Sequence, residues 1–406
     1  MNRIAVVLAA LLVTAAVPVG SVAAQQSSTD ASAYTGTHVS FDTKTNAVTN
    51  YTVDGVTVVE SVETSSQADA SVGLDVALSA VTDVEASGLS LAATSETNAT
   101  VRADSGATLR AHDNPKGTLV VSAGNESQYV TADLGANATA AQAGNSRIIV
   151  EQDGRMGAFI LVGNGSVTVN EEGNVTADLQ NGSRLVYRSY SDGRTDDDKQ
   201  TEKLIASGSA TTEVYVMQDG DETTVDAIHY DENTTVELSE QTKDNVTVTI
   251  DRSVHQGTVV VTSVSEEALA ATDNLSVMVD GEAAVQASSY TELQSAANGG
   301  ETSKYLVQET SAEGETNVLV AVNHFSERQV TMSGDDSSST SDETTTPESS
   351  DDTTSDKTTE DAEATETTSG EDAAETTTSS TSAPGFGVGL TVVALAGAAL
   401  VARRRA

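Results

Sequence analysis

The sequence has no cysteine, no tryptophan and only 20 lysines and arginines in 406 residues. The absence of cysteine excludes disulfides, thiol catalysis, iron–sulfur clusters and cysteine-ligated zinc. The scarcity of basic residues argues against nucleic acid as a partner, because phosphate binding depends on lysine and arginine. Without disulfides the fold must be stabilised by its core, and roughly 300 residues are enough to build one.

Acidic residues are in large excess, with 61 Asp and Glu and a net charge of −41. Such a charge destabilises a compact state through self-repulsion unless salt screens it. At about 1 M salt the Debye length is ~3 Å, so neighbouring surface carboxylates barely repel one another. The composition therefore predicts a halophilic protein. Disorder is the competing explanation of such charge, but residues 34–333 show strong hydrophobic alternation that argues against it.

The N-terminus is typical of an export signal. A basic start at Arg3 is followed by an apolar run over residues 4–19 and by small residues up to Ala24. This pattern predicts a signal peptide over residues 1–24 that signal peptidase removes. A retained transmembrane helix is the alternative, although the run is shorter than the roughly 20 residues that a span needs.

The C-terminus combines a Pro-Gly-Phe tripeptide (Pro384, Gly385 and Phe386), an apolar run over residues 388–402 and three arginines, Arg403–Arg405. Arginines stay on the cytoplasmic side, so the chain before Pro384 is expected outside the cell. These residues resemble the PGF-CTERM sorting signal of archaeal surface proteins, and with the acidic composition they indicate a haloarchaeal protein. The resemblance is confined to residues 384–406. It implies that an archaeosortase cuts near the tripeptide and that a membrane lipid is joined to the new C-terminus. An uncut single-pass helix is the alternative, and both place the protein at the cell surface.

Residues 334–383 consist almost entirely of Ser, Thr, Asp and Glu, with Lys357 as the only base. Such a segment cannot bury enough apolar surface to fold. We expect a disordered stalk, extended by like charges and by O-glycans on its hydroxyl groups, that holds the preceding domain away from the membrane.

The body, residues 34–333, is predicted to be mainly β, an antiparallel β-sandwich-like domain. Asn-Gly and Asp-Gly pairs between alternating runs are strong hairpin signals. Six such pairs begin at Asp54, Asp153, Asn164, Asn181, Asp219 and Asp280. In residues 245–250 the aliphatic side chains alternate with threonines, which predicts a half-buried strand. Residues 317–325 are apolar on both faces and are expected to be covered on both sides.

Two short helices are predicted, one over Ser265–Thr272 and one after a capping box at Ser289–Glu292. They suggest a small α+β part over residues 257–333. The charged segment 192–203 is interpreted as a loop between sheets. The body therefore has candidate subdivisions near 192–203 and near 257.

The candidate modification sites are ten Asn-x-Ser/Thr sequons, which in an exported chain are acceptors for N-glycosylation wherever they are exposed. They are Asn50, Asn98, Asn125, Asn137, Asn164, Asn174, Asn181, Asn233, Asn245 and Asn274.

The sequence predicts no catalytic residue, no metal site and no cofactor. The five histidines (His38, His112, His229, His255 and His324) lack the paired spacing of zinc ligands, and no Gly-x-Ser-x-Gly, Walker or Rossmann motif occurs. Acidic loops at 192–198 and 219–222 do not follow the spacing of a calcium-binding loop. Tyr187 and Tyr190, with Arg184, Arg188 and Arg194, suit either a ligand surface or an ordinary cross-strand face.

These observations favour an exported, membrane-anchored cell-surface glycoprotein with a structural, adhesive or envelope-associated role, and not an enzyme. Its expected partners are a membrane lipid, signal peptidase, an archaeosortase and cell-envelope glycoproteins such as those of an S-layer. A surface-tethered module that binds a ligand or solute is the alternative. A tethered hydrolase is a third, and it would require carboxylates or His–Asp pairs to converge in space.

Overall fold

The computed structural model describes residues 32–334 with the exception of 69–76, 83, 220–221, 243–244, 270–274, 309–314 and 326. These residues form a mainly β structure of four sheets, which confirms the predicted fold class. The signal peptide, the stalk and the sorting signal lie outside the described residues, so their predicted boundaries remain predictions.

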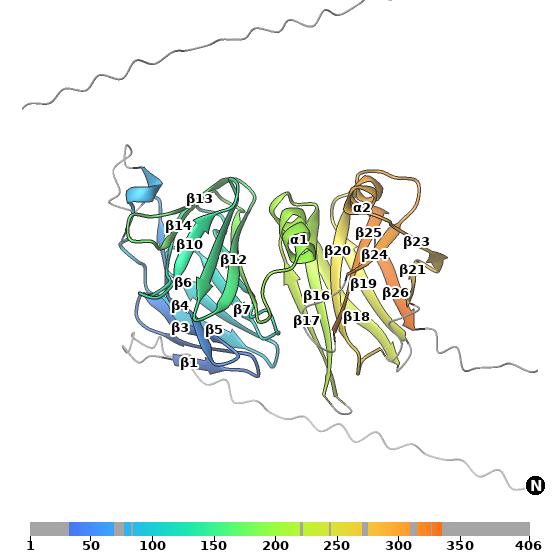
Figure 1. Ribbon diagram of the computed structural model, residues 1–406, viewed down its shortest axis with the longest axis horizontal. Coiled ribbons are helices and arrows are strands. Elements are labelled where there is room, and N and C mark those ends of the chain that lie inside the picture. The colour runs from blue at the N-terminus through green and yellow to red at the C-terminus, as the bar shows by residue number, and fades with distance from the viewer. Residues whose placement is uncertain are drawn as a thin grey trace, which may run out of the picture. The chain divides into compact units, whose positions relative to one another are not determined.

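The first two sheets form an N-terminal sandwich (Figure 1). The seven-stranded sheet has the order β1-β2-β3-β4-β9-β14-β13, and the eight-stranded sheet has the order β10-β11-β12-β15-β8-β7-β6-β5. The strands are β1 Ser32–Thr35, β2 Val39–Thr43, β3 Ala47–Val53, β4 Val56–Ser66, β5 Leu89–Thr94, β6 Asn98–Ala103, β7 Thr108–His112, β8 Leu119–Ser122, β9 Gln128–Asp133, β10 Thr139–Gln142, β11 Arg147–Gln152, β12 Arg155–Val162, β13 Gly165–Val169, β14 Val175–Leu179 and β15 Arg184–Tyr190, with a short 3-10 turn at Leu78–Ala80. Their inner faces share one apolar core that includes Tyr51, Leu109 and Phe159.

The other two sheets form a C-terminal sandwich, with strand orders β17-β16-β20-β25-β24-β23 and β18-β19-β26-β21-β22. Its elements are β16 Ala210–Asp219, β17 Glu222–His229, β18 Thr234–Thr242, β19 Asn245–Arg252, β20 Gln256–Ser265, β21 Leu275–Val279, β22 Glu282–Ala283, β23 Val285–Gln286, β24 Lys304–Gln308, β25 Glu315–His324 and β26 Arg328–Gly334, together with helices α1 Asp196–Ala206 and α2 Tyr290–Ala297. Val248, Val260 and Val330 belong to the core between these sheets.

A third apolar cluster joins the two sandwiches. It contains Ile160 and Val186 from the eight-stranded sheet, Leu204 from α1, and Val259 and Leu319 from the six-stranded sheet. Strand β25 is accordingly covered on both faces, as its sequence predicts: Val320 lies in the core of the C-terminal sandwich, and Leu319 lies in the cluster that joins the sandwiches.

Three of the predicted two-residue hairpin turns are confirmed with both residues at positive φ. Asp54 and Gly55 connect β3 to β4, Asp153 and Gly154 connect β11 to β12, and Asp280 and Gly281 connect β21 to β22. Strands β16 and β17 are also paired up to Asp219 and Glu222. The left-handed backbone at both positions matches the twist of the flanking strands, which is why Asn-Gly and Asp-Gly pairs are favoured there.

The pairs at Asn164 and Asn181 are not hairpin turns. Each lies between a strand of the eight-stranded sheet and a strand of the seven-stranded sheet, so the chain crosses from one layer of the sandwich to the other. Gly163 and Gly165 take φ values of 92° and 143°, whereas Asn164 is not in the left-handed region. The Asn-Gly pairs correctly predicted a change of chain direction, but they do not specify to which sheet the next strand belongs.

The prediction of a loop at 192–203 was wrong, because most of this segment forms α1. Thr195 Oγ1 accepts a hydrogen bond from the Asp198 backbone at 3.0 Å, and Asp198 Oδ2 accepts one from the Thr195 backbone at 2.9 Å. This reciprocal capping box and three aspartates at the positive helix end stabilise the first turn.

The two helices predicted further along the chain had different outcomes. Ser289 caps α2 as expected, although the Glu292 carboxylate binds Ser288 instead of Ser289. Ser265 accepts from the Ala268 backbone, but the described residues after it form only a turn. Residue 257 lies inside β20, which pairs in parallel with β16 and antiparallel with β25. The suggested subdivision near 257 is therefore not a break in the C-terminal sandwich.

Candidate functional site

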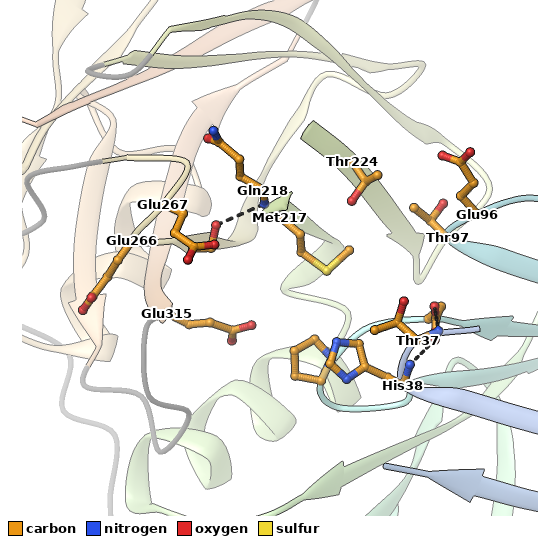
Figure 2. Close-up of a pocket in the computed structure, with 13 residues that line it drawn as sticks. Thr37, His38, Glu96, Thr97, Met217, Gln218, Thr224, Glu266, Glu267 and Glu315 are labelled. Atoms are coloured by element: carbon orange, nitrogen blue, oxygen red, sulfur yellow. Dashed lines mark hydrogen bonds between the residues drawn. The ribbon is translucent and has the colours of Figure 1, made fainter. Parts of the chain in front are cut away.

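A cleft of about 650 Å³ opens where the two sandwiches meet. One side is formed by Thr37 and His38 before β2 and by Glu96 and Thr97 before β6. The other side is formed by Met217 on β16, by residues 265–267 at the end of β20 and by Glu315 at the start of β25. Figure 2 shows these side chains around one hollow. Its lining includes Glu96, Asp113, Glu266, Glu267 and Glu315, so the cleft is strongly acidic.

Asp113 has a structural role at the base of the cleft. Its carboxylate accepts hydrogen bonds from the backbone N–H groups of Thr37, His38 and Val39 at 2.7, 2.8 and 2.7 Å. A Cβ atom at Gly36 would clash with this carboxylate, which explains a glycine there. Because three backbone donors occupy it, Asp113 has little capacity left for a ligand.

His38 lies at the mouth of the cleft and is held by Asp54. The distance from His38 Nδ1 to Asp54 Oδ1 is 2.8 Å, and Arg155 Nη2 lies 2.9 Å from the other carboxylate oxygen. The hairpin turn between β3 and β4 thus orients a histidine over the cleft. No serine or threonine hydroxyl among the described residues is hydrogen-bonded to this imidazole.

Glu315 is the most buried glutamate of the cleft lining. Burial raises the pKa of Glu315, and the neighbouring Glu213 raises it further, while Lys116 and His38 act in the opposite direction. Across the described residues, no three His, Asp or Glu side chains are grouped so that they could hold a metal ion. The acidic lining can attract cations and polar solutes, but among the described residues it does not form a metal site.

Beneath the cleft, the two sandwiches are connected by charged groups that are fully buried. Arg188 on β15 is 1% exposed and lies 2.8 Å from Glu213 on β16, which is 0% exposed. The hydroxyl groups of Tyr215 and Tyr230 donate to the two oxygens of Glu213 at 2.8 and 2.5 Å. We call Arg188, Glu213, Tyr215 and Tyr230 the junction network.

A second buried carboxylate, Glu202 of α1, ties the helix to the N-terminal sandwich. It accepts from Arg194 on both oxygens at 2.5 Å, from Arg147 at 3.0 Å and from the Tyr190 hydroxyl at 2.9 Å. Nearby, Lys116 pairs with Asp198 at 3.1 Å. The Tyr–Arg segment was predicted to form either a ligand surface or an ordinary cross-strand face. Tyr187, Arg188 and Tyr190 are at most 2% exposed, so they form no ligand surface.

The histidines and acidic loops do not assemble into a metal site within the described part of the chain. His112 is buried and pairs with Asp226 at 2.7 Å, His255 Nδ1 lies 2.9 Å from the Phe325 carbonyl oxygen, and His324 contacts Arg328. The carboxylates of Asp196, Asp197 and Asp198 separate toward Lys199, Tyr290 and Lys116.

The sequons are distributed over both sandwiches. Asn50, Asn125, Asn137, Asn164, Asn181 and Asn233 are exposed. Asn98, Asn174 and Asn245 are half-buried, and the side-chain oxygens of Asn174 and Asn245 accept hydrogen bonds from Leu134 and Ser333. Asn274 lies outside the described residues. The six exposed asparagines are therefore the more accessible acceptors among the described sequons.

Two comparisons with known proteins give little information about the body. No curated protein matches the chain. Four chains of solved structures match, among them a family 81 glycoside hydrolase from Clostridium thermocellum, at 12% identity and a TM-score of 0.33 over 73% of this chain and 34% of that one. The chain spans about a third of that enzyme, and so low a TM-score supports no conclusion about fold or activity.

The C-terminal segment gives a definite match. A family model for the PGF-CTERM motif matches residues 383–405. In the described ranges no helix is long and apolar enough to cross a membrane. The motif marks the chain as an archaeosortase-processed, membrane-anchored protein of the cell surface.

Proposed function

We propose that this protein is a non-enzymatic, lipid-anchored glycoprotein of the haloarchaeal envelope, with a structural or adhesive role. The observation that carries the proposal is the order of segments: a sorting motif at residues 383–405 follows a Ser/Thr-rich acidic stretch, and this stretch follows a large, mainly β body. A stalk between lipid and body positions the body for contact with other envelope components.

The structure of the body supports a mechanical role more than a catalytic one. Each sandwich has its own apolar core, and a third apolar cluster joins the two sandwiches, so the body is packed from end to end. The aspartates of its two His–Asp pairs also bind an arginine or an amide side chain: Asp54, the partner of His38, binds Arg155, and Asp226, the partner of His112, binds Asn114. A hydrolase would need one such pair aligned with a nucleophile or a second carboxylate.

Mass spectrometry of the protein from the membrane fraction tests the anchoring. We expect a mature chain that lacks residues 1–24 and Arg403–Arg405 and that carries a lipid at its new C-terminus. N-glycans are expected on exposed sequons such as Asn125 and Asn233. Retention of Arg403–Arg405 would instead show a single-pass anchor.

Cross-linking on intact cells tests the envelope role. The full chain should form adducts with envelope glycoproteins, and removal of residues 335–383 should reduce them because the body is then held against the membrane. A secreted variant that ends at Gly334 serves as the control for contacts that need no anchor. Equal cross-linking by all three forms would contradict the proposed role of the stalk.

A further inference from the structure

A small cavity of about 150 Å³ on the eight-stranded sheet has the opposite character to the acidic cleft. Its lining contains two arginines, two histidines, two hydroxyl side chains and one valine, and no carboxylate. The lining residues are Thr108, Arg110, His112, Val120, Ser122, Arg184 and His229. In a chain with 61 acidic and 20 basic residues, a cavity lined by basic side chains without a carboxylate is unexpected unless it binds an anion.

The register of three adjacent strands builds this cationic pocket. Thr108 of β7 pairs with Ser122 of β8, and Ser122 pairs in turn with Arg184 of β15. Side chains alternate along a strand, so Thr108, Arg110 and His112 share the outer face of β7. Leu109, on the inner face, belongs to the core of the N-terminal sandwich. His229, at the end of β17, adds a group from the C-terminal sandwich.

The positive charge of the pocket is only partly neutralised by the protein. Arg110 makes no ion pair among the described residues, and its Nε lies 3.4 Å from the Thr100 hydroxyl. Arg184 donates to the carbonyl oxygens of Gly182 and Tyr230 and lies 3.8 Å from Glu232, which is largely exposed. Burial lowers the pKa of Arg184, and Arg110 lowers it further, against the influence of Glu232 and Asp231.

His229 adds a titratable group to the lining of the pocket. Its Nδ1 is buried and has no hydrogen-bond partner among the described residues. Burial lowers the pKa of His229, and the nearby His112, Arg110 and Arg184 lower it further, while Asp231 raises it. On its far side, His112 is paired through Nδ1 with Asp226. An anion in the pocket would favour the protonated form of His229.

We propose that this pocket binds one oxyanion the size of sulfate, either a free ion or the charged group of an anionic polysaccharide. Arg110 and Arg184 would pair with the oxyanion, and the hydroxyl groups of Thr108 and Ser122 and the His229 imidazole would donate hydrogen bonds to it. Planar guanidinium groups match oxyanions better than chloride, so the site can select its ligand in concentrated salt. The cavity is too small to enclose a polymer chain, so a polysaccharide would insert only its charged group.

Equilibrium dialysis of the full chain with radiolabelled sulfate, in about 2 M sodium chloride to screen the surface charges, tests the proposal. We expect saturable binding of one sulfate, weakened at least tenfold by Arg110→Gln or Arg184→Gln and unaltered by Lys44→Gln, which removes an exposed cation from the turn between β2 and β3. Binding should strengthen from pH 8 to pH 5.5, and His229→Asn should flatten this dependence. Circular dichroism would confirm that each variant is folded.

Competition separates the two sources of the ligand. If dextran sulfate displaces labelled sulfate at far lower sulfate-group concentration than the free ion does, the ligand is a charged group on a polymer. Equal displacement per sulfate group identifies the free ion, and neutral dextran should displace nothing. Absence of saturable binding, or equal loss in Arg110→Gln and Lys44→Gln, would overturn the proposal. The inference does not depend on the proposed structural role, because a cytosolic or unanchored form would bind equally.

Discussion

The interiors of the two sandwiches and the junction between them are stabilised in different ways. Each sandwich has an aliphatic and aromatic core, in which residues such as Leu109 and Val320 are fully buried. At the junction, apolar residues share the space with charged groups that are just as buried, among them Arg188, Glu202 and Glu213. The interiors therefore supply most of the folding free energy, and the junction adds directional contacts.

The difference suggests separate roles for the two kinds of contact. Apolar packing is non-directional and tolerates small rotations of one sheet on another. A buried ion pair contributes little net stability over an apolar pair, but it is strongly destabilising when one partner is lost. We therefore expect the junction network to determine how the sandwiches meet, while the apolar cores determine whether each sandwich folds.

Dilution of salt should produce the largest effect, because it acts on the whole surface and spares the buried pairs. Because acidic residues far outnumber basic ones in the body as well, transfer from about 2 M to about 0.1 M salt should unfold it, as repulsion between surface carboxylates is restored. Circular dichroism during dialysis would measure this. An unchanged spectrum at low salt would remove the argument for a halophilic protein.

Loss of one partner in the junction network should have the next largest effect. Glu213→Ala leaves the Arg188 charge buried and removes the acceptor of Tyr215 and Tyr230, which should cost about 3–5 kcal/mol of unfolding free energy. Denaturant titration in high salt gives this value. The exposed Glu240→Ala is the matched control and should change stability by less than about 0.5 kcal/mol.

A double variant tests whether the unpaired buried charge of Arg188 causes the loss of stability. Glu213→Ala combined with Arg188→Met should recover part of the loss, because no unpaired charge stays buried. A double variant as unstable as the sum of its two single variants would contradict this account of the junction.

Truncation of a side chain in a sandwich interior should lower the free energy of unfolding slightly less than Glu213→Ala does. Unlike the effect of salt on the surface charges, this loss should not depend on the salt concentration. Leu109→Ala should lower the free energy of unfolding by about 2–5 kcal/mol, since it removes buried methyl groups and leaves a cavity. This loss should be the same at about 1 M and about 3 M salt, because no charge is involved. Denaturant titrations at both salt concentrations would test it.

The smallest effect is expected at the capping box of α1. Burial alone would raise the pKa of Asp198, but Lys116 and the hydrogen bonds from Thr195 outweigh it and hold the pKa below its ordinary value of 3.8. A carboxyl whose folded pKa is lowered stabilises the fold above the unfolded pKa and loses this contribution as the pH falls through the folded one. Asp198→Asn should therefore lower the melting temperature by a few degrees at neutral pH, and the difference from the unsubstituted protein should close in acid.

The sequence predicted local geometry well and long-range contacts poorly. Asp54-Gly55 and Asp280-Gly281 were predictable because both residues of such a turn need a left-handed backbone. Asn164-Gly165 and Asn181-Gly182 carry the same signal, yet they connect strands of different sheets, which no local pattern specifies. Helix α1 was not predicted because its charged residues suggested a loop. Two helix signals were present: Thr195 and Asp198 form a capping box, and Leu204 and Ile205 supply a buried face.

The candidate sites could not be found from sequence spacing. His112 and Asp226 are separated by 114 positions, and Arg188 and Glu213 come from different sandwiches. Arg110 and Arg184 converge only because β8 lies between β7 and β15 in the sheet. The one available signal was the rarity of arginine itself, since each arginine in so acidic a chain is a candidate for a specific contact.

The last strand of the body has a consequence for how the protein bears force. Strand β26 is not at an edge: it pairs with β19 on one side and with β21 on the other, up to Ser333 and Gly334. A pull from the membrane anchor acts on the body at Gly334. It loads the hydrogen bonds of β26 to both β19 and β21 at once, whereas a pull on an edge strand would break the hydrogen bonds to a single neighbour. A terminal strand paired on both sides resists such a pull better than a strand at the edge of the sheet would.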